Sequence, residues 1–313
     1  MPWRRPPSQE GMGEDHFSPK TFHPKTLATL GGWWNDGAML LSSPLLISEK
    51  SFFGVQVMGA LMSQFRLEGK TALVTGGSKG LGLAMARILG EAGASVLICS
   101  RHQGELEKAL ELIPVTGKAR KGCLVADLGR RAEADSLAEA AQREFGAVDI
   151  LVNNAGTNKP QSIDMIEDEV WDTVMELNLN SVMALSRALC KGMKARGWGR
   201  IIHISSIMGL LSKEKRNVYS ATKSALLGLC RAMALDLGPS GVTVNCLSPG
   251  PFLTDLPMSV LSDAEKQEFS DHTALGRWGQ TEELAGPLLL LASEAGRYIT
   301  GANLVVDGGF TIR

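Results

Sequence analysis

Residues 71–82, TALVTGGSKGLG, decide how the rest of this sequence is interpreted. A short apolar run ends in glycines at Gly76, Gly80 and Gly82, and a helical pattern over 81–92 follows. Glycine lets the backbone turn sharply and approach a pyrophosphate, whose charge is met by N–H groups at the start of a helix. The stretch therefore predicts a strand, a nucleotide-binding turn and a helix, with the spacing G-x-x-x-G-x-G.

The alternation of apolar runs and helical patterns continues along the chain. Further helical patterns occupy 131–145, 168–195 and 219–237. Strands are predicted at 71–75, 94–99, 121–125, 148–152, 200–205, 242–247 and 302–306. Such a pattern indicates an α/β, Rossmann-type doubly wound sheet of about seven parallel strands with helices on both faces. In this fold the ligand lies beyond the carboxyl ends of the strands.

Composition narrows the classes of partner. The 313 residues are 44% hydrophobic and 21% charged, with a formal net charge of -1, which gives no electrostatic signature for nucleic acid or an anionic membrane. The five cysteines and five histidines show no metal-ligand or disulfide spacing. We therefore expect a cytoplasmic protein with reduced thiols, no metal and a small-molecule partner.

Residues 1–64 differ from the remainder. They are rich in Pro, Gly, Ser and Trp and have neither helical nor strand periodicity, so we expect an extension that is disordered or lies upstream of a translation start at Met62. The apolar stretch 39–62 is interrupted by a proline and a Glu-Lys pair, and no membrane span is predicted. A single folded domain is expected over 65–313.

The end of the second predicted strand indicates the cofactor. An Asp or Glu there would bind the ribose 2′-hydroxyl of NAD, but the chain has Ser100 and Arg101. Arg101, helped by Lys79 in the glycine turn, can instead pair with a 2′-phosphate. NADP is favoured over NAD, while the alternative is that both cations are solvated surface residues.

Several motifs in a fixed order resemble the short-chain dehydrogenase/reductase family, in its single-domain branch. They are TGGSKGLG at 75–82, Asp127, NNAG at 153–156, Asn178, Ser206, YSATK at 219–223, SPG at 248–250 and ITGANLVVDGG at 299–309. The resemblance covers about Phe65 to Arg313 and leaves the N-terminal extension outside. It implies one NADP-binding catalytic domain and a homotetramer built partly from the helices near 168–195 and 219–237.

The resemblance also implies a catalytic set of Asn178, Ser206, Tyr219 and Lys223. Tyr219 and Lys223 are four residues apart on a predicted helix and share a face. A free tyrosine has a pKa of ~10, and a nearby ammonium should lower it, while the phenol serves as the acid in reduction. Ser206 would hold the substrate oxygen, and Asn178 would order a water-mediated proton path to Lys223. Ser205 and Asn180 are the competing assignments.

Cofactor contacts are expected at the strand ends. Asp127 would face the adenine end of the cofactor, and Thr254 would donate a hydrogen bond to or accept one from the nicotinamide carboxamide. The alternative for Asn153 and Asp127 is that they only cap loops, because Asn and Asp favour turns. The full expected set is Gly76, Ser78, Lys79, Gly80, Leu81, Gly82, Arg101, Asp127, Leu128, Asn153, Ala155, Gly156, Tyr219, Lys223, Pro249, Gly250 and Thr254. Residues 252–278, with one short helix near 263–270, are expected to form a substrate lid.

The expected reaction interconverts a ketone and a secondary alcohol by hydride transfer to or from NADP. Residues 65–77 and 274–310 resemble gluconate 5-dehydrogenases, which points to a keto-sugar acid, and also 3-oxoacyl-acyl-carrier-protein reductases. Lys213, Lys215 and Arg216 could attract a carboxylate or simply form a solvated loop. A non-catalytic NADP-binding regulator is the alternative outside the enzymes. Such a protein would be recognised by the loss of the catalytic Ser, Tyr or Lys, and none of these is missing here.

Overall fold

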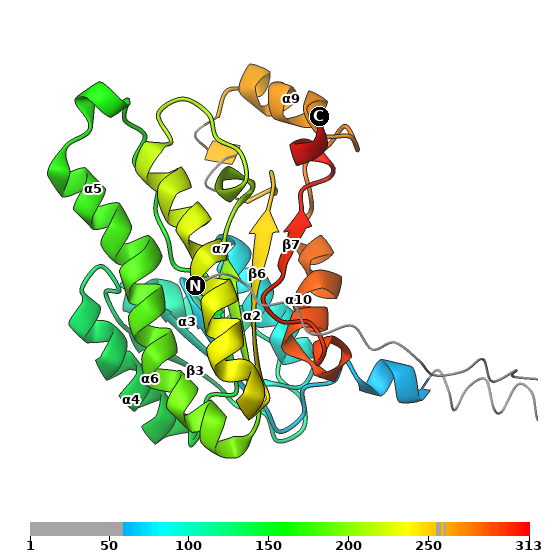
Figure 1. Ribbon diagram of the computed structural model, residues 1–313. Helices are drawn as coiled ribbons and strands as arrows, with labels where there is room; N and C mark the ends of the chain where they lie inside the picture. The colour runs from blue at the N-terminus through cyan, green and yellow to red at the C-terminus, as the bar shows by residue number, and fades with distance from the viewer. Residues whose placement is uncertain (1–58, 255–257, 260) are drawn as a thin grey trace, which may run out of the picture. The chain divides into compact units, whose positions relative to one another are not determined.

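The computed structural model describes residues 59–254, 258–259 and 261–313 (Figure 1). The prediction for the N-terminal extension falls mostly on residues 1–58, outside the described part. Residues 59–63 are helical and exposed. Within the described residues, no helix is long and apolar enough to cross a lipid bilayer.

In the part of the chain that the structure describes, seven parallel strands form one sheet in the order β3-β2-β1-β4-β5-β6-β7. β1 pairs with both β2 and β4, so its carboxyl end lies at the point where the strand order reverses. The strands are β1 (Thr71–Thr75), β2 (Ser95–Ser100), β3 (Lys121–Val125), β4 (Ile150–Asn153), β5 (Gly199–Ile204), β6 (Val242–Pro249) and β7 (Asn303–Val306). The predicted Rossmann-type α/β fold is confirmed, with strand bounds shifted by at most two residues.

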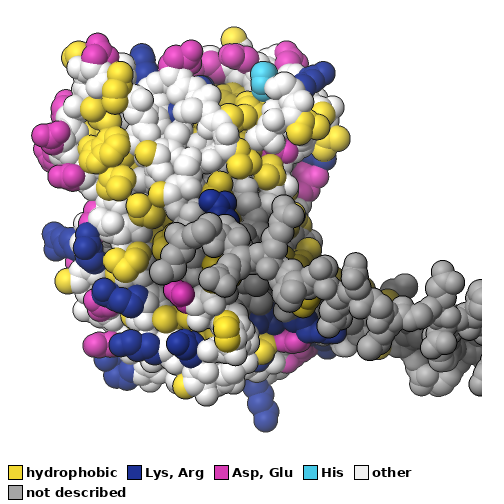
Figure 2. All heavy atoms as spheres, viewed as in Figure 1, with side chains coloured by type: hydrophobic (Ala, Val, Ile, Leu, Met, Phe, Trp, Pro, Cys, Tyr) yellow, Lys and Arg dark blue, Asp and Glu magenta, His cyan; other side chains and the backbone are white. Residues whose placement is uncertain are grey.

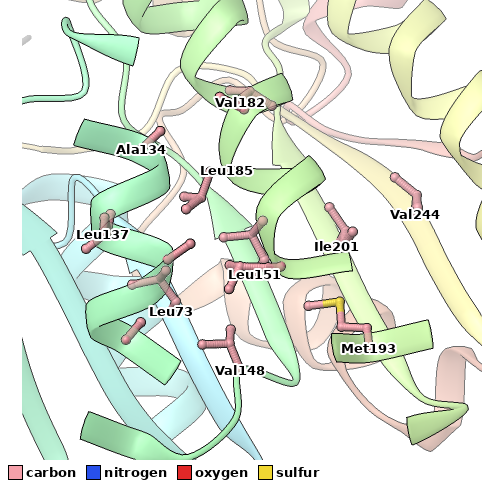
Figure 3. Packing of buried hydrophobic residues seen from close by; sticks show 14 of the residues in the cluster. Leu73, Ala134, Leu137, Val148, Leu151, Val182, Leu185, Met193, Ile201 and Val244 are labelled. Atoms are coloured by element: carbon pink, nitrogen blue, oxygen red, sulfur yellow. The ribbon is translucent and has the colours of Figure 1, made fainter. Parts of the chain in front are cut away.

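Helices cover both faces of the sheet (Figure 1). On one face lie α2 (Gly80–Glu91), α3 (Gln103–Leu112) and α10 (Ala285–Ala292), and on the other α4 (Arg131–Phe145), α6 (Ser181–Arg196) and α7 (Asn217–Leu237). Leu73 and Leu151 point into the second of these layers beside Leu185 of α6, as Figure 3 shows, whereas Ala72 and Val74 face the first. Burial on both sides explains why the strands are continuous apolar runs.

The helix predicted over 168–195 is divided into three pieces. α5 (Asp168–Met175) and α6 are joined by a π-helical segment, Glu176–Asn180. A π turn adds a residue to the helical repeat and is frequent at functional sites. The 3.6-residue apolar pattern could not reveal it, because the apolar face resumes on both sides of the insertion.

The region predicted as a lid contains α9 (Asp263–Asp271). Its start is fixed by a capping box, in which Ser262 Oγ accepts from the Glu265 N–H and the Glu265 carboxylate accepts from the Ser262 N–H, an arrangement whose serine cap contributes roughly 1 kcal/mol. Figure 1 shows α9 beside the C-terminus, beyond the ends of β6 and β7. Residues 255–257 and 260 of the predicted lid lie outside the described residues.

The charged side chains of the described surface are mixed. On the face shown in Figure 2, Lys and Arg side chains lie among Asp and Glu side chains. This agrees with a formal net charge of -1 for the whole chain. That face therefore has no uniform positive surface of the kind that binds a polyanion.

Candidate active site

Two cavities lie at the carboxyl edge of the sheet. Their volumes are about 720 and 730 Å³. The first, which we call the dinucleotide cavity, lies over the ends of β1, β2 and β3, and the second, the substrate cavity, lies over the ends of β5 and β6. The two adjoin, because both are lined by Leu81, Asn154, Gly156, Tyr219 and Thr254.

The glycine turn lines the dinucleotide cavity and requires its glycines. Gly76 and Gly80 have φ values of +63° and +56°, the left-handed region that glycine tolerates. A Cβ on Gly82 would overlap the Gly76 carbonyl oxygen and lie 2.6 Å from Asn154 Nδ2. The turn thus presents bare backbone at the start of α2, where phosphate groups bind, so its shape fits a dinucleotide.

Most of the residues expected to contact a cofactor line this same cavity. They are Gly76, Ser78, Lys79, Gly80, Leu81, Gly82, Arg101, Asp127, Leu128, Ala155, Gly156, Tyr219 and Thr254. Pro249, Gly250 and Lys223 line the substrate cavity instead. Asn153 lines neither cavity.

The two basic residues expected at the 2′-phosphate have different surroundings. Lys79 Nζ lies 3.4 Å from Glu105 Oε1. The other carboxylate oxygen, Glu105 Oε2, accepts from Ser78 Oγ at 3.2 Å. Arg101 is exposed and forms no ion pair with a carboxylate of the described residues. Arg101 is therefore the freer cation. Glu105, in the first turn of α3, was not anticipated from the sequence.

The two asparagines of NNAG point in opposite directions. Asn153 is buried, and its Nδ2 lies 3.2 Å from Ser186 Oγ and 3.1 Å from His203 Nδ1. Asn154 Nδ2 donates to the Thr75 carbonyl oxygen at 2.8 Å and so ties the glycine turn to the end of β4. The residue expected at the cofactor was Asn153, whereas Asn154 lines the cavity, and the alternation of side chains along a strand is the signal that distinguishes them.

Ser206, Tyr219 and Lys223 converge on the substrate cavity. Ser206 Oγ accepts from the Met208 N–H at 3.1 Å, and the Ser206 hydroxyl is one of the groups that lower the pKa of Tyr219. Lys223 Nζ lies 5.6 Å from the centre of the Tyr219 ring and donates to the Ile204 carbonyl oxygen at 2.7 Å. The competing Ser205 donates to the Lys223 carbonyl oxygen at 2.9 Å, so its hydroxyl is already committed to α7.

The electrostatics of Tyr219 differ from the sequence-based expectation. Burial raises the pKa of Tyr219, and the opposing influences are the Ser206 hydrogen bond and the Arg216 charge rather than Lys223. Burial also lowers the pKa of Lys223 to about 8. A phenol whose pKa is raised stays protonated at neutral pH, which suits it to donate a proton.

Asn178 is buried, lines neither cavity and holds a loop. Its Oδ1 accepts from the Thr157 N–H at 2.8 Å, and its Nδ2 donates to the Thr157 carbonyl oxygen at 2.9 Å. A Cβ on Gly156 would lie 3.2 Å from Asn178 Oδ1 and 3.6 Å from Lys223 Nζ, so the three residues are close neighbours. The competing Asn180 donates to Glu176 instead.

The charged side chains that line the substrate cavity are all basic. Lys213 and Arg216 lie at its wall together with Lys223, and no Asp or Glu occurs among the described lining residues. Lys215, the third basic residue of the loop, is exposed and does not line it. The remaining wall is largely apolar and includes Phe252, Leu261, Phe269 and Trp278. The cavity therefore suits an anion.

Among the described residues, no group of three or more His, Cys, Asp or Glu side chains is placed to hold a metal ion. All five cysteines are free, with three buried and two half-buried.

Comparisons with known proteins extend over most of the chain. The family model described as enoyl-(acyl carrier protein) reductase matches residues 76–311. Gluconate 5-dehydrogenase of Gluconobacter oxydans is 36% identical over 252 residues, 79% of this chain and 97% of the relative. 3-Oxoacyl-[acyl-carrier-protein] reductase of Pseudomonas aeruginosa is 37% identical over 78% of this chain and 98% of the relative.

A solved structure has the same fold and a related sequence. It is a gluconate 5-dehydrogenase from Burkholderia cenocepacia, crystallised in complex with NADP and tartrate. Its TM-score is 0.75 at 35% identity, covering 81% of this chain and 99% of that one.

Proposed function

This chain belongs to the short-chain dehydrogenase/reductase family of oxidoreductases, and from that premise we propose that it uses NADP to interconvert a keto-sugar acid and its secondary alcohol. The observation that carries the substrate class is the all-basic set of charged side chains in the substrate cavity. A carboxylate there would meet Lys213 and Arg216 without an opposing carboxylate from the described lining. The tartrate complex of the Burkholderia relative also supports an acid as substrate.

The residues of the dinucleotide cavity fit NADP. The bare turn of Gly76, Gly80 and Gly82 would accept the pyrophosphate, and Arg101 would pair with the 2′-phosphate. Lys79, shared with Glu105, would add a weaker interaction. Bound NADPH supplies the hydride that reduces the carbonyl carbon, and NADP accepts it in the reverse direction.

The protein's own residues manage the proton and the oxygen. Ser206 and Tyr219 hold the substrate oxygen by hydrogen bonds, and Tyr219 donates its phenolic proton as negative charge develops there. Lys223 lies one turn along α7, and its ammonium donates the proton that restores the phenol, through a path that Asn178 helps to order. In oxidation the same groups act in reverse, with the Tyr219 phenolate as the base.

A second candidate substrate is a 3-oxoacyl thioester. The apolar wall of Phe252, Leu261, Phe269 and Trp278 could pack against an acyl chain, and the Pseudomonas relative is named for that activity. We rank it second because such a substrate has no carboxylate for Arg216. A non-catalytic regulator ranks below both, because Ser206, Tyr219 and Lys223 meet in one cavity.

A homotetramer in the cytoplasm completes the proposal. Family membership supports the homotetramer, with helices α5 to α7 at the subunit contacts. The free cysteines support a reducing compartment such as the cytoplasm. Light scattering in solution should give a mass of about four chains, as expected for a closed symmetric oligomer. A monomer would contradict the tetramer without affecting the reaction.

The decisive experiment is an NADPH-oxidation screen with the purified full chain. Substrates are 5-ketogluconate, other keto-sugars, acetoacetyl thioesters and small neutral ketones. We expect activity on 5-ketogluconate, and a Tyr219→Phe variant should lose about 10²- to 10⁴-fold in kcat. Activity confined to the thioesters would contradict the substrate class, and an undiminished Tyr219→Phe variant would contradict the mechanism.

A further inference from the structure

Two loops meet at the wall of the substrate cavity and are tied to each other. Residues 157–161, the first loop, and 213–217, the second loop, are joined by a bridge between Gln161 and Arg216. The Gln161 N–H donates to the Lys215 carbonyl oxygen at 3.1 Å, and Asn217 Nδ2 donates to the Gln161 carbonyl oxygen at 2.9 Å. Side chains on the two loops are therefore fixed relative to one another.

Asn158, on the first loop, carries an unsatisfied acceptor. Asn158 is one of the residues that line the substrate cavity, and its Oδ1 is buried with no hydrogen-bond partner. Buried polar atoms in folded proteins are almost always paired. The preceding residue, Thr157, is held at both its N–H and its carbonyl by Asn178, so the backbone cannot easily shift to relieve Asn158. A ligand hydroxyl in the cavity would supply the missing donor.

Arg216, on the second loop, carries an unpaired cation. Arg216 lines the same cavity, and its guanidinium forms no ion pair with a carboxylate of the described residues. The preceding residue, Lys215, has a φ of +63°, which is unfavourable for a side chain other than glycine. The Gln161 contacts maintain this conformation. Neighbouring Lys213 lies 4.9 Å from the centre of the Phe269 ring, which leaves Arg216 as the group best placed for a bidentate contact.

We propose that Asn158 and Arg216 form a two-point specificity site for a polyhydroxy carboxylate. Arg216 pairs with the carboxylate and Asn158 Oδ1 accepts a hydrogen bond from a substrate hydroxyl, while the reacting oxygen lies at Ser206 and Tyr219. This inference rests on the proposed function and narrows it. A site that pairs a buried acceptor with a hydroxyl discriminates strongly against an analogue that lacks the hydroxyl, since the acceptor is then left unpaired.

The test compares 5-ketogluconate with 5-oxohexanoate, which has the same charge and carbon number but lacks the hydroxyls. Asn158→Ala should raise KM for 5-ketogluconate by about tenfold or more and change KM for 5-oxohexanoate by less than about twofold. Asn158→Ser, which retains an acceptor, should recover part of the loss. Arg216→Gln should raise KM for both acids, whereas KM for a neutral ketone should change by less than about twofold.

Binding provides a readout that is independent of turnover. Calorimetry on the NADPH-saturated enzyme, in which gluconate has no hydride acceptor, should show that Asn158→Ala weakens gluconate binding and leaves hexanoate binding unchanged. Equal losses by Asn158→Ala on the hydroxylated and the plain acid of either pair would overturn the two-point site, as would no loss at all in Asn158→Ala or in Arg216→Gln. A wild-type enzyme inactive on both keto acids would overturn the proposed function. The effect of Asn158→Ala on gluconate affinity would still test whether Asn158 contacts a ligand hydroxyl. Circular dichroism and an unchanged Kd for NADPH verify that each variant is folded.

Discussion

The buried ammonium of Lys223 lowers the stability of the folded protein. Its side chain is 5% exposed, and burial lowers its pKa to about 8 from the ordinary value of 10.5. The unfolded chain therefore binds more protons than the folded one between pH 8 and 10.5. In that window the stability of the wild-type protein rises with pH, and below pH 8 the full cost of burying the ammonium applies.

A Lys223→Met variant removes this linkage. The free energy of unfolding of the variant, minus that of the wild type, should fall by about 2 kcal/mol between pH 7 and pH 10. Urea unfolding at a series of pH values measures the difference. Lys108→Met, on the exposed side of α3, controls for the loss of a lysine at the surface. A difference for Lys223→Met that stays flat with pH would contradict the buried ammonium.

Residue types at the site could be predicted from the sequence, whereas side-chain directions could not. Tyr219, Lys223 and Ser206 were identified by their order and spacing, and all three line one cavity. The Asn153 side chain, in contrast, lies in the core, and Asn154 takes the place at the cavity. Adjacent strand residues face opposite ways, so a shift of one position at a strand end exchanges a core contact for a cavity contact.

Among the elements, the glycine turn and α2 form the most constrained unit. The spacing of Gly76, Gly80 and Gly82 predicted a strand, a turn and a helix, and local backbone geometry alone explains that success. The π-helical segment Glu176–Asn180 is the contrasting case. It depends on the distant contacts of Asn178 with Thr157, which no local pattern reveals.

Gly82→Ala tests the tight packing of this unit. The added Cβ would overlap backbone at Gly76, which cannot move as a flexible side chain would. We expect a loss of about 1–3 kcal/mol in unfolding free energy and a rise of at least about tenfold in Kd for NADPH, followed by fluorescence titration. The matched control is Gly104→Ala in α3, where a Cβ meets nothing within 4 Å. An unaltered Kd in the Gly82 variant would exclude the turn as the phosphate site.

Across the whole molecule, the last residues of the chain support the substrate cavity. Phe310 is buried and packs in a cluster with Tyr219 and Phe269. Its ring centre lies 6.0 Å from that of Phe269, which lines the cavity. Arg313 donates to the carbonyl oxygens of Asp271 and Thr273, at the end of α9. The sequence predicted that the tail belongs to the domain, but this long-range contact with the site appears only in the folded structure.

Phe310→Ala should therefore weaken substrate binding more than cofactor binding. Truncating a buried phenylalanine costs about 3 kcal/mol of stability and removes the packing behind Phe269. KM for 5-ketogluconate should rise by about tenfold, while Kd for NADPH should change by less than about twofold. Ile312→Ala, at a side chain that is 83% exposed, is the control. Equal effects on substrate and cofactor would indicate general destabilisation rather than a supporting wall.

The position of β1 between β2 and β4 has a consequence for synthesis on the ribosome. The strands β1, β2 and β3 occupy a continuous stretch, residues 71–125, and their ends carry the Arg101 side of the dinucleotide cavity. Chains emerge N-terminal end first, so this half of the sheet can pair before β4 to β7 exist. The half that carries Ser206, Tyr219 and Phe310 is completed only after β7 has been synthesised. A nascent chain should thus acquire the phosphate-binding turn early and its chemical competence last.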